Sequence, residues 1–229
     1  MKRLLPIRYI PRTMEQGLTV FFVFLLIYVL MSIPLAGLTY GKLVAQTTVI
    51  IGFIMSFQLF FRPGLKRKIT VSLAVAALSL LWLIHFHSTL VIAVSHSIIL
   101  ALMWLLLATE ILGQVLREGP ITWHRIRGAA SLYLFFGLLL AEFYRLVETT
   151  VPGAFQLPFG MGKEPETLYA QMVYFSFITQ TTVGFGDIIP IHPAARMLVT
   201  LQALVGQFYP AVVMGWLVSQ EVIHRTENR

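Results

Sequence analysis

A nine-residue stretch between two long apolar segments combines threonine, glycine and aspartate in an order suited to binding a cation. It reads TQTTVGFGD from Thr179 to Asp187. Gly184 and Gly186 can adopt positive φ without steric penalty, so a strand with glycine at alternate positions can turn successive carbonyls to one side. The row of oxygens would come from Thr182, Val183, Gly184 and Phe185, with the Thr182 hydroxyl below them. Such hard, neutral ligands can replace the hydration shell of a monovalent cation.

One chain supplies only one side of such a cage, and four chains around an axis would close it. The six residues TVGFGD, Thr182 to Asp187, resemble the selectivity filter of the tetrameric potassium channels. The resemblance covers about residues 128–224. It implies an ion-binding filter from Thr182 to Gly186, with K⁺ held at Thr182, Val183, Gly184 and Phe185. The alternative for this stretch is a simple glycine turn between two membrane helices.

The same resemblance assigns supporting roles around the filter. Tyr174 and Phe175 match paired aromatics that pack behind the filter, which is compatible with ordinary core packing. Asp187 matches the acidic residue at the outer mouth. Phe185 replaces the commoner tyrosine, so the loss of a hydroxyl bond would reduce filter rigidity by about 1 kcal/mol per subunit. Glu142 resembles a glutamate that ties the outer helix to the filter rim; the alternative is a lipid-interface residue paired with Arg145.

The composition is that of a membrane protein. The chain has 229 residues, of which 57% are hydrophobic and 12% charged, and its mean hydropathy is +0.79. The net charge of +7 comes from short basic clusters between apolar runs, a distribution typical of cytoplasmic loops rather than of nucleic-acid binding. We therefore expect membrane lipids as partners and no nucleic acid.

Six apolar segments approach the ~20 residues needed to cross a bilayer core. They lie at about 18–38, 43–61, 69–86, 89–116, 128–147 and 194–223. A shorter apolar stretch at 167–181 indicates a re-entrant pore helix over 166–181, followed by the filter at 182–187. The expected fold class is an all-α integral membrane protein with six transmembrane helices, a re-entrant pore helix and an extended filter. Because the chain contains one filter, we expect a homotetrameric pore.

Three regions follow from these segments: a four-span N-terminal membrane domain over 1–116, an interfacial linker over 117–127 and a pore domain over 128–229. The linker would either couple the two domains or lie at the headgroups. Thirteen of the 17 Lys and Arg residues fall on the side of both termini, so the positive-inside rule predicts a multi-pass protein of the cell membrane with cytoplasmic termini. The fourth span has no Lys or Arg, so we expect no voltage sensor.

The last span carries the candidate gate. Gly206 matches the glycine at which the inner helix of the family bends, and Pro210 would loosen the same turn. Close helix packing is the alternative for Gly206. The apolar residues below this hinge, Met214, Val218 and Val222, could close the pore by dewetting. They belong to a stripe with spacings of three or four residues: Ala203, Gln207, Pro210, Met214, Val218 and Val222.

These observations predict a potassium channel that conducts passively and needs no cofactor besides its permeant K⁺ ions. The chain has no Ser/His/Asp constellation, phosphate loop or wet carboxylate pair, so we do not expect an enzyme. Two alternatives stay open: a weakly selective monovalent cation channel, because of Phe185, and a regulatory or silent subunit that needs another chain to conduct.

Overall fold

The structure is a computed structural model that describes residues 12–35, 65–86, 89–116, 122–158 and 165–227. Almost all of these residues are helical. The helices are α1 (Arg12–Leu35), α3 (Leu65–Phe86), α4 (Leu90–Val115), α5 (Trp123–Thr150), α6 (Pro165–Gln180) and α7 (Pro193–Glu227). Two short strands, β1 (Phe155–Gln156) and β2 (Ile189–Pro190), pair antiparallel with Phe155 opposite Pro190. The fold is therefore mostly helical, as expected.

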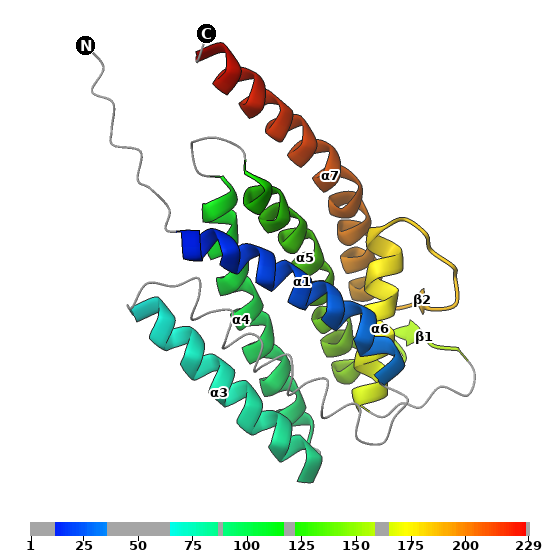
Figure 1. Cartoon of the computed structure of the whole chain (residues 1–229). Helices are drawn as coiled ribbons and strands as arrows, with labels where there is room; N and C mark the ends of the chain where they lie inside the picture. The colour runs from blue at the N-terminus through cyan, green and yellow to red at the C-terminus, as the bar shows by residue number, and fades with distance from the viewer. Residues whose placement is uncertain (1–11, 36–64, 87–88, 117–121, 159–164, 228–229) are drawn as a thin grey trace.

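The helices pack as a bundle in which α5 is central. Its longest interface is with α4, which in turn packs on α3, while α1 crosses α5 and reaches α6 (Figure 1). The long α7 contacts α5 and α6 and extends beyond the other helices. Of the N-terminal helices, α1 thus lies against α5 and α6, α4 lies against α5, and α3 packs on α4.

Local sequence explains several helix starts. Thr89 and Thr122 adopt extended backbone conformations, and their hydroxyls accept from the amides of Ile92 and Arg125 at the starts of α4 and α5. Proline stands first in both α6 and α7, where its missing amide hydrogen costs nothing.

The interior joins apolar side chains from most of the helices. Phe21 of α1 stacks on Phe135 of α5 with ring centroids 5.4 Å apart, and Trp104 of α4 meets the same ring at 4.7 Å. All three side chains are almost fully buried. Because one aromatic cluster holds three helices, the N-terminal helices and the pore region form a common core.

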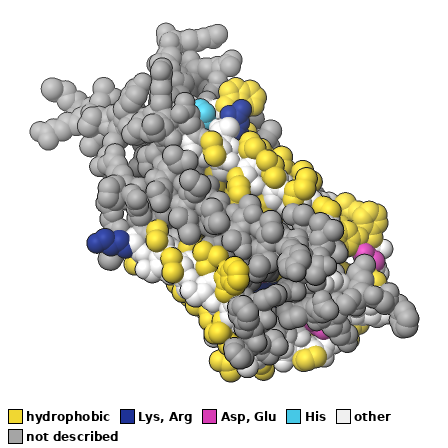
Figure 2. All heavy atoms as spheres, turned by 60° about the horizontal axis from the view of Figure 1, so that its bottom comes forward, with side chains coloured by type: hydrophobic (Ala, Val, Ile, Leu, Met, Phe, Trp, Pro, Cys, Tyr) yellow, Lys and Arg dark blue, Asp and Glu magenta, His cyan; other side chains and the backbone are white. Residues whose placement is uncertain are grey.

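Two described helical segments are long and apolar enough to cross a membrane, Leu90–Gly113 and Trp123–Thr150. The apolar parts of α1 and α3, Gly17–Ser32 and Lys68–Leu80, are shorter. Figure 2 shows that hydrophobic side chains make up much of the described surface on one face, where charged side chains are sparse. An apolar outer surface on helices is the pattern expected for contact with lipid or with other apolar chains.

The expected segments at 18–38, 69–86, 89–116, 128–147 and 194–223 correspond to α1, α3, α4, α5 and α7. The expected segment at 43–61 lies outside the described residues. The pore helix, expected over 166–181, is α6 at Pro165–Gln180. Of the expected linker at 117–127, the residues from Trp123 onward are the first turn of α5 rather than a separate interfacial helix. Residues 117–121 lie outside the described part.

Candidate ion-conducting site

Positive φ recurs at every second residue along the backbone of the filter. Positive φ occurs at Thr182 (62°), Gly184 (55°) and Gly186 (78°), whereas Val183 and Phe185 between them do not have it. Alternation between left-handed and right-handed conformations turns successive carbonyls toward one side of the strand. The two glycines behave as their lack of a Cβ predicts. Thr182 was not expected to share this conformation, which is rare for a β-branched residue and points to a functional constraint.

The filter is hydrogen-bonded to the end of the helix before it. The Ile178 carbonyl of α6 accepts from the amides of Val183 at 2.9 Å and Gly184 at 3.2 Å, and the Thr179 carbonyl accepts from the Thr182 amide at 3.0 Å. The last carbonyls of a helix lack partners within the helix. Here the filter amides satisfy them, so the position of the last turn of α6 sets the position of the lower filter.

The opposite side of the filter is open in the single chain. Val183 is 53% and Phe185 71% exposed. Beside the filter lies a hollow of about 380 Å³ whose lining includes Ile178, Thr182, Val199 and Ala203. Within one chain the strand is therefore anchored on α6 along one side and uncovered on the other.

The outer end of the filter is tied to the surrounding loops. The Asp187 carboxylate accepts from the Ile188 amide at 3.1 Å and also interacts with the Tyr174 hydroxyl of α6. Beyond it, the Ala154 carbonyl accepts from the Ile191 amide at 2.8 Å. Tyr174 therefore lies near Asp187 at the outer end of the filter, and its expected role in an aromatic pair behind the filter stays a prediction.

Phe175 plays a different part from Tyr174. Its ring packs against Tyr144 of α5 and Phe155 of β1, with centroids 5.4 and 5.6 Å away. Phe175 is 5% exposed, so it belongs to the buried core between α6, α5 and the strand pair. Of the two readings offered by the sequence, core packing describes Phe175 within one chain.

A buried chain of hydrogen bonds runs behind the filter and was not foreseen from the sequence. Gln202 of α7 donates through Nε2 to Ser176 Oγ at 2.7 Å and to Gln180 Oε1 at 3.1 Å, while its Oε1 accepts from the Tyr144 hydroxyl. Ser176 donates to the Gly137 carbonyl at 2.6 Å. The four polar side chains of this network have no exposed surface. Three helices are thus joined by directional bonds next to the filter.

Two glycines let α6 fit between its neighbours. A Cβ at Gly137 of α5 would stand 2.8 Å from the Phe177 ring. A Cβ at Gly206 of α7 would stand within 3.0 Å of the Gln180 backbone. The structure therefore supports the packing interpretation of Gly206, and its role as a hinge stays a prediction. Pro210 lies inside α7, which continues through it.

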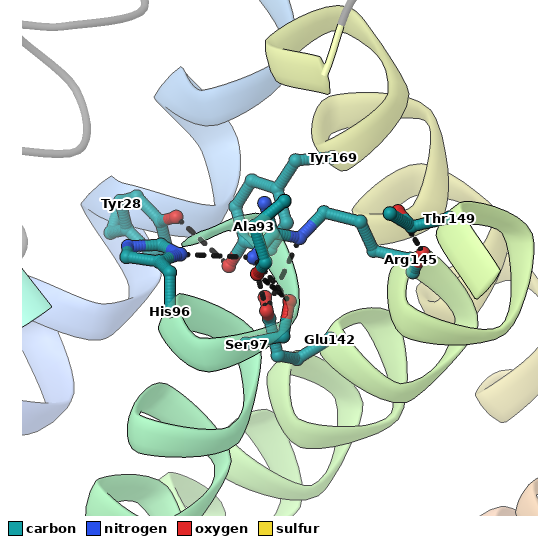
Figure 3. A network of polar contacts seen from close by, with 8 residues as sticks. All are labelled: Tyr28, Ala93, His96, Ser97, Glu142, Arg145, Thr149 and Tyr169. Carbon is teal, nitrogen blue, oxygen red and sulfur yellow. Dashed lines mark hydrogen bonds and ion pairs between the residues drawn. The ribbon is translucent and has the colours of Figure 1, made fainter. Parts of the chain in front are cut away.

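Glu142 belongs to a polar cluster at the junction of four helices. Figure 3 shows side chains from α1, α4, α5 and α6 converging around Arg145. The Arg145 guanidinium pairs with Glu142 Oε1, donates to Ser97 Oγ at 2.8 Å and lies 3.0 Å from His96 Nδ1. Arg145 is 6% and Glu142 1% exposed. The pairing that the sequence offered as an alternative therefore exists, but in the protein interior; the tie from Glu142 to the filter rim stays a prediction.

This cluster reaches the pore helix as well. The Arg145 guanidinium lies over the Tyr169 ring at 5.7 Å, and Tyr28 of α1 donates to the Tyr169 hydroxyl at 3.2 Å.

Another buried carboxylate, Glu148, stabilises the loop after α5 by accepting hydrogen bonds from the amides of Gly153 and Phe155, each at 2.9 Å. Sequence reasoning missed Glu148 because its partners are backbone groups, which leave no pattern of residue types.

The middle of α7 is tied to α5 and, through Arg125, to the end of α4. Arg125 of α5 donates to the Val115 carbonyl at the end of α4, with Nη2 2.8 Å away, and lies over the Trp216 ring at 5.4 Å. The Tyr209 hydroxyl donates to the Ala129 carbonyl at 2.8 Å. The side chains of the expected gate residues Met214, Val218 and Val222 lie outside the described part, so the gate stays a prediction.

Helix α6 packs between α5 and α7 and leads into a segment in which positive φ alternates, the arrangement that the sequence predicted for a pore loop. Residues 129–220 match the model of a family described as "Ion channel". This region is therefore similar to that family, and the two long apolar helices among the described residues agree with a place in a membrane.

A curated relative agrees with this assignment. The chain is 28% identical over 142 residues to the voltage-gated potassium channel Kch of Escherichia coli (strain K12). The alignment covers 62% of this chain but only 30% of that protein, so the chain spans less than a third of the relative's length. No solved structure matches the chain significantly. The resemblance to the potassium channel family, drawn from Thr182 to Asp187, is confirmed by the family match and by this relative.

Proposed function

We propose that the chain forms a potassium-selective channel that conducts K⁺ passively across the membrane. The observation that carries the proposal is the alternation of positive φ at Thr182, Gly184 and Gly186, in a strand anchored on the last turn of α6. This backbone offers a ladder of carbonyl oxygens suited to a dehydrated monovalent cation. The carbonyls of Thr182, Val183, Gly184 and Phe185 are the proposed K⁺ ligands, and the carbonyl of Gly186 continues the row.

The proposed assembly is a homotetramer. In one chain the filter is bare on one side, and α7 presents a stripe of large apolar side chains that are each at least half exposed. The stripe consists of Met197, Leu201, Leu204, Phe208 and Val212. Four copies around an axis would cover this stripe and bring four filters together, which is the closed symmetry that identical interfaces favour.

Gating by voltage through α4 is not part of the proposal. Moving charge through the membrane field needs basic residues within the moving helix, and Leu90–Val115 contains none. The proposed topology is multi-pass in the cell membrane with both termini in the cytoplasm. It follows the distribution of basic residues.

Recording from the purified chain in planar bilayers tests this function. With K⁺ on one side and Na⁺ on the other, we expect a reversal potential near the K⁺ limit, together with a tetrameric mass in detergent. Equal permeation would favour the weakly selective cation channel, because Phe185 lacks the hydroxyl of the commoner tyrosine. A silent tetramer would favour the regulatory subunit.

A glycine pair supplies a matched control. Gly184 and Gly153 both have positive φ, 55° and 88°, and neither has an atom near enough to meet an added Cβ. Alanine at either position therefore acts through backbone conformation, at about 1–2 kcal/mol per chain. We expect Gly184→Ala to abolish selective K⁺ current and Gly153→Ala, in the loop after α5, to preserve it.

A further inference from the structure

We propose that Gln180 and Gln202 form an amide pair that positions the filter, so that the inner helix α7 holds the lower filter in its K⁺-selective geometry. This inference rests on the proposed function. It assigns positioning roles to two residues outside the filter, one on the pore helix and one on the inner helix.

The pair is built as a fully bonded unit. Gln202 donates twice and accepts once, so each polar atom of its amide has a partner. Gln180 accepts from Gln202 and donates through Nε2 to the Tyr133 carbonyl at 2.7 Å. Both side chains are fully buried. In a dry interior such bonds are directional and strong, and losing one partner leaves the other unsatisfied.

The pair acts on the turn that carries the filter. Gln180 is the last residue of α6, two positions before Thr182. Its backbone carbonyl accepts from the Tyr133 hydroxyl at 3.1 Å, so α5 fixes the main chain at the point where the side chain meets α7. The carbonyl of Ile178, in the same turn, accepts hydrogen bonds from the amides of Val183 and Gly184. A rotation or shift of this turn would therefore move the filter carbonyls with it.

Apolar side chains of similar volume would fill the same space without fixing an orientation. Hydrogen bonds fix both distance and angle, whereas apolar contacts tolerate sliding and rotation. The amides at 180 and 202 thus add orientation to a contact that Gly137 and Gly206 already make close. These hydrogen bonds therefore fix the orientation of α6 between α5 and α7.

Because residue 185 is phenylalanine, the geometry of the filter depends more strongly on the last turn of α6. Phe185 has no hydroxyl with which to hold the middle of the filter, and Tyr174 contacts Asp187 only at its outer end. The lower filter then depends on the last turn of α6, and that turn depends on Gln180 and Gln202.

The test uses the full chain reconstituted in planar bilayers. Gln180→Leu/Gln202→Leu removes both amides at nearly constant volume, and Tyr144→Phe removes only the hydroxyl that Gln202 Oε1 accepts from. We expect the K⁺/Na⁺ permeability ratio to fall at least about tenfold in the double variant and about threefold in Tyr144→Phe. The rise in unfolding temperature on exchanging Na⁺ for K⁺ in detergent should shrink in the same order.

Gln171→Leu is the matched control, since Gln171 is a buried glutamine of α6 whose amide has no hydrogen-bond partner among the described residues. It should keep the wild-type ratio. A tetrameric double variant with the wild-type ratio, or an equal loss in Gln171→Leu, would overturn the inference. If the double variant does not assemble, the K⁺/Na⁺ permeability ratio of Tyr144→Phe and its rise in unfolding temperature with K⁺ decide the question. A wild-type protein without K⁺ preference would instead refute the proposed function, so the two failures are distinguishable.

Discussion

Gly206 of the inner helix lies directly against the backbone of Gln180, the last residue of the pore helix. A Cβ at 206 would come within 3.0 Å of the Gln180 Cα and carbonyl carbon, and closer still to the carbonyl oxygen. Backbone atoms cannot move aside as a flexible side chain can. The contact therefore requires glycine whether or not α7 also bends there.

Gly206→Ala should destabilise the protein by about 1–3 kcal/mol, because overpacking at this contact pushes α7 away from α6. Thermal unfolding in detergent measures the effect. Gly215→Ala is the control on the same helix, where an added Cβ meets no atom within 4 Å. There, the better helix propensity of alanine should leave stability unchanged or raise it by up to about 1 kcal/mol. Equal destabilisation by both variants would contradict the packing interpretation.

Arg145→Met should destabilise the fold by about 3–5 kcal/mol, because Glu142 would be left as a buried charge without its partner. Unfolding of the purified protein by heat or denaturant measures this loss. The double variant Arg145→Met/Glu142→Met removes both charges and should recover a large part of the stability. If the double variant were no more stable than the single one, the ion pair would not be the dominant contact of the cluster.

Trp216→Leu should shift the open–closed equilibrium, because it removes the ring that lies against the Arg125 guanidinium. A cation–π contact is worth about 0.5–1 kcal/mol, or about a two- to fivefold change for each subunit. Open probability from single-channel recording gives the readout. Trp123→Leu replaces an exposed tryptophan at the start of α5 and should leave open probability unchanged. Identical shifts in both variants would mean that the effect is not specific to the contact with Arg125.

Val218→Asp should raise conduction at rest, because four carboxylates at an apolar constriction would keep it wetted. Ser219→Asp places the same charge one residue further along α7, about 100° around the helix, and should change resting current much less. Resting current in symmetric K⁺ is the measurement. An unchanged closed state in Val218→Asp would place the gate elsewhere, for example at the filter.

Glycine chemistry and hydropathy made part of the fold and site predictable. Gly184 and Gly186 have the positive φ that their alternation indicated, and the pore helix ends within a residue of its expected limit. Thr182 was missed because positive φ is rare for a β-branched residue, so no property of threonine itself indicates this conformation.

Long-range polar contacts were not predictable. Gln180 and Gln202 are 22 positions apart, and an isolated glutamine in an apolar helix gives no sign of whether it faces lipid, water or another amide. Arg145 was visible as a neighbour of Glu142, but its bonds to His96 and Ser97 depend on how α4 packs on α5. Residue type shows that a polar group needs a partner, and only packing decides which partner it finds.

The bond between Tyr28 and Tyr169 joins residues 141 positions apart, and α1 packs on α5 and α6. During synthesis, α1 leaves the ribosome long before either partner exists. Its inward face, with Leu18, Phe21 and Leu25, must wait in lipid or against the insertion machinery until the pore half is made. We therefore expect the N-terminal half to reach its final packing only after the C-terminal half has been made, so that the two halves do not fold as successive modules.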